Sequence, residues 1–246
     1  IATDNSGIRA GFIKAITDKL TFDIDGTYSN KNSNSNIPSS PYYLLYPNWQ
    51  LAVSPKVKAN FGEWGTTVLG YDFNQASQSS SSGSTFGTTT LQQNVGITNQ
   101  SVYLVSRIPL RVINGLEASG GFRHQAQNAS TNDLSYGSVI SANQKYSANA
   151  GDVALNYNYQ AGQKIFVKWD QSYRFPNTDE FWGFDPNANG GVGAPVFNGI
   201  LKPQISQTYS AGGDWNIYQS HISALVFQSI TQNEIRYDPS TYANIN

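Results

Sequence analysis

The segment DQSYRFPNTDEFWGFDP, residues 170–186, places an arginine beside several aromatic rings at the end of an alternating stretch. Arg174 can hold an anionic ligand by charge-assisted hydrogen bonds. The rings of Phe181, Trp182 and Phe184 can form apolar platforms for a bulky ligand, since binding sites are mostly apolar with a few placed polar groups. Four rings earlier in the chain have the same potential: Tyr42, Tyr43, Tyr46 and Trp49. We take these eight residues as the candidate ligand-binding residues.

Each of these residues also has a structural alternative. The rings would serve equally well to pack loops together or to form an aromatic girdle at a membrane interface. Arg174 would serve to tie the end of its strand to a neighbouring carboxylate, Glu180 or Asp179. Both readings stay open at the level of sequence.

Catalytic and metal chemistry find little support in the sequence. There is no cysteine or methionine, the two histidines, His124 and His221, are far apart, and no Gly-x-Ser-x-Gly motif is present. We expect no catalytic residues, no metal site and no cofactor, and the histidine ligands of a haem receptor are not evident. The formal net charge of -1 gives no basis for nucleic-acid binding.

The elements that carry the candidate residues are strands. In KIFVKWDQSYRF, residues 164–175, two sets of side chains alternate, which is the sign of a strand with two different faces. One face has Ile165, Val167, Trp169, Tyr173 and Phe175, and the other has Lys164, Lys168, Asp170, Ser172 and Arg174. Residues 20–29, 51–61 and 153–159 repeat the pattern, whereas GIRAGFIKAIT and HISALVFQSIT alternate unevenly and are weaker predictions.

The connections between strands fall into two kinds. Tight turns recur near Asp18, Gly62, Asn114, Gly162 and Ile217, and long polar loops rich in Gly, Ser and Asn separate them. Short turns at one end, long loops at the other and apolar-out, polar-in strands are typical of an outer-membrane barrel. A soluble β-sandwich or lectin-like domain is the alternative. Aromatic residues beside the turns predict a girdle: Phe61, Trp64, Tyr157, Tyr159, Trp215 and Tyr218.

The number and direction of the strands predict part of a larger barrel. If the tight turns are periplasmic, about ten strands begin and end at the outer surface, whereas a complete barrel with an even strand number keeps both ends in the periplasm. The inward charges also fit a wide lumen better than a small, filled barrel. Cations and acids offset one another on the inward faces, so we expect no simple anion funnel: Lys56, Lys58, Arg123, Lys164 and Lys168 against Asp23, Asp25, Asp72 and Glu117.

The chain resembles the middle of the barrel of a TonB-dependent outer-membrane receptor. In these receptors a strand ends in an aromatic residue, Arg, x and Pro with an acidic residue shortly after, and a strand of the form Leu-Lys-Pro-x-x-Ser-x-x-Tyr-x-x-Gly follows. SYRFPNTDEF, residues 172–181, and LKPQISQTYSAG, residues 201–212, are similar to these two motifs. SPKV at 54–57 and EASGGFRH at 117–124 are similar to other strands of the family.

The resemblance implies an all-β transmembrane antiparallel barrel of about 22 strands, of which residues 1–246 form about ten. It implies a location in the bacterial outer membrane, contact with its lipid, and energised import of a scarce, bulky nutrient. A ferric siderophore is the expected ligand, and coupling to the TonB complex would pass through a plug domain that this sequence lacks, as it lacks the last strands. The alternatives are import of cobalamin or a carbohydrate, a passive porin-type channel, an omptin-like barrel enzyme, or a surface role in adhesion or phage docking.

Overall fold

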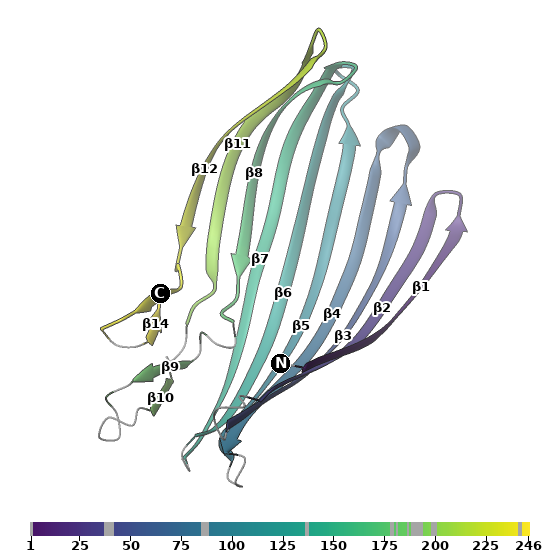
Figure 1. Ribbon diagram of the computed structural model, residues 1–246. Coiled ribbons are helices and arrows are strands. Elements are labelled where there is room, and N and C mark those ends of the chain that lie inside the picture. The colour runs from purple at the N-terminus through teal and green to yellow at the C-terminus, as the bar shows by residue number, and fades with distance from the viewer. Residues whose placement is uncertain are drawn as a thin grey trace.

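The computed structural model describes residues 2–36, 42–84, 89–135, 138–177, 180, 182–185, 187, 194–197, 201–240 and 243–246. Ten strands pair in chain order into one antiparallel, curved sheet, in which β11 follows β8 directly (Figure 1). Their bounds are β1 Ala2–Thr17, β2 Leu20–Asn36, β3 Tyr42–Asn60, β4 Thr66–Ser84, β5 Thr89–Pro109, β6 Leu116–Ser135, β7 Ser138–Gln160, β8 Gln163–Arg174, β11 Gln204–Ile217 and β12 Ser220–Gln232. The predicted set of about ten strands is confirmed.

Two small hairpins and one short helical turn complete the described residues. β9 Trp182–Asp185 pairs with β10 Ala194–Phe197, and β13 Arg236–Asp238 pairs with β14 Ala243–Ile245. Both hairpins lie at the lower, loop end of the sheet in Figure 1. The 3-10 turn η1 Gly62–Trp64 joins β3 to β4. No helix in the described part of the chain is long and apolar enough to cross a membrane.

All five tight turns lie at one end of the sheet, the upper end in Figure 1. At the other end the prediction of long loops is wrong for three of the polar stretches, because the strands run through most of them: β2 ends at Asn36 and β3 begins at Tyr42, β4 ends at Ser84 and β5 begins at Thr89, and β6 ends at Ser135 and β7 begins at Ser138. Of the connections between strands of this sheet, only the one from β8 to β11 is long. The backbone geometry of the turns explains one of their glycines. Gly115 has a φ of 81°, and an added Cβ there would lie 2.0 Å from the carbonyl oxygen of Asn158. Only glycine fits this position without strain.

The predicted aromatic girdle beside these turns is present. Phe61, Trp64 and Tyr218 are exposed, and the rings of Tyr157 and Tyr159 lie 6.0 Å apart. The guanidinium of Arg111, from the β5–β6 turn, lies 3.9 Å from the centre of the Trp64 ring, which links two neighbouring turns. Aromatic rings at this level mark a membrane–water interface in barrels.

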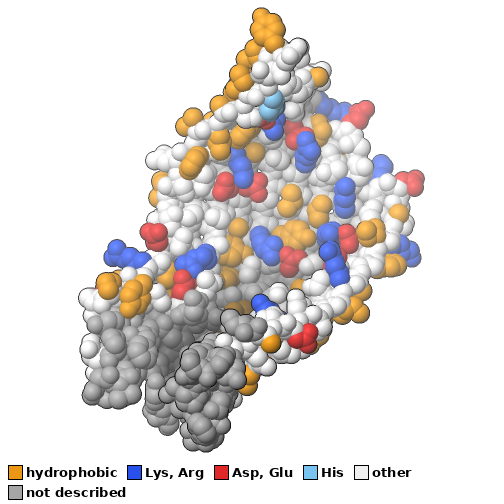
Figure 2. Space-filling model, viewed as in Figure 1, with side chains coloured by type: hydrophobic (Ala, Val, Ile, Leu, Met, Phe, Trp, Pro, Cys, Tyr) orange, Lys and Arg blue, Asp and Glu red, His pale blue; other side chains and the backbone are white. Residues whose placement is uncertain are grey.

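The two faces of the sheet differ in chemistry as alternation predicts. Figure 2 shows Lys, Arg, Asp and Glu side chains distributed over the hollow, concave face. The opposite, outward face is apolar near the turns: Val153 and Leu155 on β7 and Val167 on β8 are 43–59% exposed. Farther from the turn, toward the loop end of β7, the outward residues become polar, beginning with Asn149 and Ser147. Because about 9–11 residues of a tilted strand cross a bilayer, the 23 residues of β7 extend well beyond the apolar band.

The sheet is curved but not closed, and β1 and β12 are its edge strands. These are the two segments whose alternation is uneven in the sequence. Every described residue of both strands is exposed, and apolar residues occur on both of their faces, as Ile13 on β1 and Phe227 on β12 show. Both ends of the chain lie toward the loop end of the sheet (Figure 1).

Candidate functional site

The candidate site lies where β8 parts from β7. The pairing of β7 with β8 ends at Gly151 and Gln171, whereas β8 remains paired with β11 as far as Arg174 and Gln204. β7 continues beyond this point and stays paired with β6 to Ser138. The last residues of β8 are therefore free of their neighbour on one side and can lie over the concave face of β5, β6 and β7.

Tyr173 and Phe175 occupy this position over the concave face. The hydroxyl of Tyr173 donates a hydrogen bond of 2.7 Å to Oε1 of Gln125 on β6. The ring of Phe175 stacks on that of Tyr146 from β7 at a centroid distance of 5.8 Å and lies 5.1 Å from the Tyr173 ring. Phe175 is 8% exposed and belongs to the small core formed with Tyr146, Ala148 and Ala129.

This arrangement corrects the facing predicted for the end of the strand. The outward assignment holds for Val167 and Trp169, which line a groove on the outward face. It is wrong for Tyr173 and Phe175, which pack on the concave face. The reason is physical: alternation keeps a side chain on one face of a wall only while the strand stays in that wall, and β8 leaves its pairing with β7 after Gln171.

Beside these rings the concave face is hollowed, with a volume of about 510 Å³. Three amide side chains form its polar part: Gln125 and Gln127 donate hydrogen bonds of 3.1 and 3.0 Å to Oδ1 of Asn99. Gln127 is only 8% exposed, and no donor among the described residues reaches its Oε1. A buried carbonyl oxygen without a donor costs free energy, so the hollow offers an acceptor suited to a hydrogen-bond donor from outside the wall.

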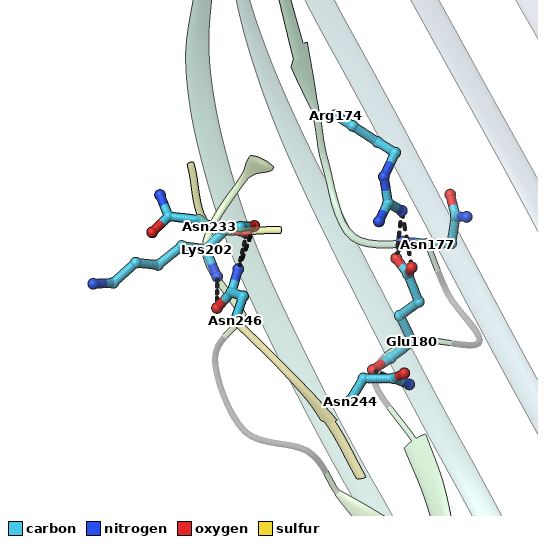
Figure 3. A network of polar contacts seen from close by, with 7 residues as sticks. All are labelled: Arg174, Asn177, Glu180, Lys202, Asn233, Asn244 and Asn246. Atoms are coloured by element: carbon cyan, nitrogen blue, oxygen red, sulfur yellow. Dashed lines mark hydrogen bonds and ion pairs between the residues drawn. The ribbon is translucent and has the colours of Figure 1, made fainter. Parts of the chain in front are cut away.

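Arg174 lines the same hollow and fastens the end of β8 to the segment that follows (Figure 3). Its Nη1 donates to both carboxylate oxygens of Glu180, at 2.9 and 2.7 Å. The backbone N–H of Asn177 donates to the same carboxylate at 2.7 Å, and Asn244 donates to the Glu180 carbonyl oxygen at 3.3 Å. The structural alternative with Glu180 is thus realised, and Asp179 lies outside the described residues.

A second set of contacts in Figure 3 holds the end of the chain against the start of β11. Asn246 accepts a hydrogen bond from the backbone N–H of Lys202 and donates one of 2.6 Å to the Lys202 carbonyl oxygen. It also donates to the carbonyl oxygen of Asn233 at 3.3 Å. Leu201 is 3% exposed and Pro176 is fully buried, so the motif residues Pro176, Glu180 and Leu201 all have structural roles here.

Of the inward charges named from the sequence, all but Lys58 have an ion-pair partner among the described residues, which agrees with the prediction of no anion funnel. Arg123 reaches Asp72 at 2.8 Å and lies over the ring of Tyr103, which itself covers Gly70. The other inward ion pairs are Arg9–Asp25, Lys56–Asp23, Arg107–Glu117, Lys164–Asp214 and Lys168–Asp170. Exposed pairs of this kind add little stability, but they leave a wall of mixed sign along the concave face.

The eight candidate residues are only partly brought together. Tyr42, Tyr43 and Tyr46 belong to β3, and Trp182 and Phe184 to β9, but the side chains of all five lie outside the described residues, as does Phe181 altogether. Trp49 is half-buried and, by alternation with Leu51, faces outward. Four strands separate β3 from β8, so of the eight only Arg174 is shown at the hollow.

The amides Asn99, Gln125 and Gln127 were missed at the level of sequence. Their inward facing could have been inferred, because Gln125 and Gln127 alternate with the inward Arg123, but their grouping depends on the register between β5 and β6. The two histidines are not brought together: His124 lies on β6 and His221 on β12. No group of three His, Asp or Glu residues in the described ranges could hold a metal ion.

Comparisons with known proteins agree on the fold. The family model described as TonB dependent receptor-like, beta-barrel matches residues 2–246. A comparison with curated proteins finds no match. The copper transporter OprC shares 14% identity over 98% of this chain and 41% of its own, with a TM-score of 0.78. The ferric citrate transporter FecA shares 13% over 98% and 37%, with a TM-score of 0.71. The siderophore receptor PiuA from Acinetobacter baumannii shares 14% over 99% and 42%, with a TM-score of 0.68. The chain thus spans 37–42% of the length of these structures.

Proposed function

The chain belongs to the TonB-dependent receptor family as part of its outer-membrane β-barrel, and on this premise we propose that it serves the energised import of a ferric siderophore. The family consists of receptors and transporters of the Gram-negative outer membrane, not enzymes. The apolar outward face and the turn-side aromatic rings fit that membrane. The import activity, its ligand and its coupling to the TonB complex through a plug domain are properties of a longer receptor.

The hollow on the concave face is the observation that carries the proposal. Its volume of about 510 Å³ lies within the range of roughly 300–1,000 Å³ found for ligand sites. Aromatic rings from Tyr173 and Phe175 border it, and the amides of Gln125 and Gln127 supply placed polar groups. The Oε1 of Gln127 accepts no hydrogen bond from the described residues, and an amide or hydroxyl group of a siderophore would supply the donor.

Arg174 supplies positive charge for the anionic oxygen atoms that surround the iron of such a ligand. The two hydrogen bonds from Arg174 to the Glu180 carboxylate both come from Nη1 of the guanidinium. Its other nitrogen atoms would donate charge-assisted hydrogen bonds to the ligand. The remaining proposed contacts are rings of the loop end: Tyr42, Tyr43, Tyr46, Phe181, Trp182 and Phe184. The outward facing of Trp49 favours a girdle role for that residue instead.

The names of the similar structures support an iron complex more than a soft metal ion. FecA is named for ferric citrate and PiuA for a siderophore, whereas OprC is named for copper. Soft thiolate and thioether ligands select Cu(I), and this sequence contains neither cysteine nor methionine. The residues of the hollow favour hydrogen bonding to a bulky complex.

The test is uptake of radio-iron, presented as a panel of ferric siderophores, in cells with and without the full-length gene. Each measurement is made with the proton-motive force intact and again after its collapse. Accumulation that needs both the gene and the force supports the proposal and identifies the ligand. Uptake that survives collapse would indicate a passive channel, and no gene-dependent iron uptake would move the test to cobalamin and carbohydrates.

A further inference from the structure

A histidine, a carboxylate and a hydroxyl meet on the concave face, close to the turn that joins β11 to β12. Asp214 on β11 pairs with Ser223 on β12. His221 is two positions from Ser223 on the same strand, so it points to the same face as that pair. Nε2 of His221 lies 3.8 Å from Oδ1 of Asp214, and Oγ of Ser223 lies 3.2 Å from that nitrogen and 2.6 Å from that oxygen. We call these three residues the turn-side cluster.

The hydrogen bonds around His221 determine which of its ring nitrogens carries the proton. Nδ2 of Asn216 donates to the carbonyl oxygen of Gly162 at 3.1 Å, which turns the amide oxygen of Asn216 toward the ring. That oxygen lies 2.9 Å from Nδ1 of His221 and can only accept, so Nδ1 is the donor. In the neutral imidazole the other nitrogen, Nε2, is then an acceptor, and it faces Ser223 and Asp214.

The turn-side cluster therefore brings together three acceptor atoms that share one proton. The hydroxyl of Ser223 donates to Oδ1 of Asp214, in a short bond to a charged acceptor. The 3.8 Å from Nε2 of His221 to the same oxygen is too long for a hydrogen bond. Lys164 reaches the other carboxylate oxygen, Oδ2, at 3.0 Å and leaves Oδ1 to face the histidine. Acceptors gathered in this way favour a cation between them.

The distances within the cluster suit a divalent transition-metal ion. In zinc sites the metal lies about 2.0–2.1 Å from a histidine nitrogen and about 2.0–2.2 Å from a carboxylate oxygen. The sum of these distances slightly exceeds the 3.8 Å between Nε2 and Oδ1, so one ion can contact both atoms. Ser223 becomes a third ligand when its hydroxyl proton turns away. A hydrogen bond from the second ring nitrogen, here to Asn216, is typical of metal-binding histidines.

We propose that Asp214, His221 and Ser223 bind one divalent transition-metal ion of the zinc or copper type and thereby link β11 to β12. The imidazole nitrogen favours such ions over Mg²⁺ and Ca²⁺, which prefer oxygen ligands. The proposal departs from the expectation of no metal site, because the β11–β12 register brings the ligands together. Only two of the three ligands are of the His, Asp or Glu type, and the third is a hydroxyl.

The turn-side cluster is separate from the hollow that carries the import proposal. On β11, Asn216 lies twelve positions from Gln204, which pairs with Arg174 at the hollow. Metal binding at the cluster does not depend on the nature of the imported ligand. A failure of siderophore uptake would leave the metal site untouched, and a failure of metal binding would leave the import proposal untouched.

The full-length receptor, purified in detergent without a polyhistidine tag and stripped of metal with EDTA, provides the test. Zn²⁺ is titrated against a chromophoric chelator that competes for it, with and without excess Mg²⁺. His221→Ala and Asp214→Asn each remove one ligand, and Asn216→Leu removes the oxygen that orients the ring. His124→Ala is the matched control, because Nδ1 of His124 also contacts an asparagine oxygen, that of Asn149 at 2.8 Å, but His124 forms no ion pair with a described carboxylate. Resistance of each barrel to SDS on unheated gels checks that the variants fold.

We expect the wild-type receptor and His124→Ala to bind equal numbers of Zn²⁺ ions, of which excess Mg²⁺ displaces none. At the same free Zn²⁺ concentration, His221→Ala and Asp214→Asn should each bind one ion fewer. Asn216→Leu should bind that ion about ten-fold more weakly. Zn²⁺ should also raise the urea midpoint of unfolding more in the wild type than in His221→Ala.

Three results would overturn the proposal. The first is a wild-type receptor that binds no Zn²⁺. The second is a folded His221→Ala barrel that binds as many ions as the wild type. The third is an equal loss in His124→Ala and His221→Ala, which would indicate that Zn²⁺ binds single histidines without the carboxylate.

Discussion

The hydroxyl of Tyr173 donates a 2.7 Å hydrogen bond to Oε1 of Gln125, although strict alternation along β8 would put the two side chains on opposite faces of the wall. The bond exists because β8 stops pairing with β7 after Gln171 and its end lies over the concave face. This departure of one strand creates the hollow in which we place the ligand. It also explains why an aromatic-Arg-x-Pro sequence ends the strand. Phe175 and Pro176 are buried where β8 leaves the wall, and Arg174 links this end of the strand to Glu180.

Replacing Tyr173 by phenylalanine tests the bond that fixes this bend. The ring and its packing on Phe175 remain, and one hydrogen bond with a net value of about 0.5–1.5 kcal/mol is lost. We expect a two- to ten-fold rise in the Kd of the full-length receptor for its ferric ligand, because the hollow is less well ordered. Fluorescence titration would measure it. Tyr237→Phe, in the exposed hairpin β13–β14, is the control and should bind as the wild type does; equal Kd values for all three proteins would show that the bond does not shape the site.

Variants of Arg174 and Glu180 test whether the arginine only links the end of β8 to Glu180 or also contacts the ligand. Arg174→Lys keeps the charge but loses the two-oxygen contact and the further donors. Glu180→Gln keeps the shape of the carboxylate and frees the guanidinium. We expect both variants to lose protection of the Asn177 amide in hydrogen exchange, since that N–H bonds the Glu180 carboxylate.

The two variants should differ in binding. Arg174→Lys should raise the Kd for an anionic ferric complex about ten-fold. Glu180→Gln should raise the Kd less, because the guanidinium remains. Equal losses in both variants would indicate a tie without ligand contact.

Because the Tyr103 ring covers Gly70 on β4, we expect that position to tolerate no side chain. A Cβ at Gly70 would lie 2.2 Å from the ring, so Gly70→Ala must displace Tyr103 and with it the contact to Arg123. Overpacking of this kind costs about 1–3 kcal/mol. Urea titration of the barrel's unfolding would show a lower midpoint. Gly26→Ala is the control, because its nearest atoms are 3.8 Å away; a midpoint for Gly70→Ala no lower than that of Gly26→Ala would contradict the assigned packing.

The sequence predicts the strands and turns well because both depend on local signals. Alternation in residues 164–170 and the turn residues near Gly115 and Gly162 act within a few positions, and the structure confirms them. The link between Arg174 and Glu180 was also foreseen as one alternative, since the two are six residues apart. Local sequence signals therefore suffice to predict the strands, the turns and the ion pair at the edge of the site.

The hollow itself could not be predicted, because it depends on where neighbouring strands end. Tyr173 and Phe175 change face only through the loss of pairing with β7, which no pattern within β8 records. Asn99 and Gln127 are 28 residues apart and meet through the β5–β6 register. The rings at 181–184 were predicted as ligand contacts because the segment is rich in aromatic residues. The described polar groups of the hollow are instead amide side chains in the middle of strands.

The central claim, that the hollow beside Tyr173 and Phe175 binds the imported ligand, is tested most directly at Gln127. Gln127→Leu in the full-length gene replaces a buried amide by an apolar group of similar size, so the barrel should keep its stability while the ligand loses its acceptor. Gln100→Leu, exposed on the outward face of β5, is the matched control. We predict that energy-dependent uptake of the ferric siderophore at sub-saturating concentration falls about ten-fold in Gln127→Leu and is unchanged in Gln100→Leu. Normal uptake by a folded Gln127→Leu receptor would contradict the assignment of the site.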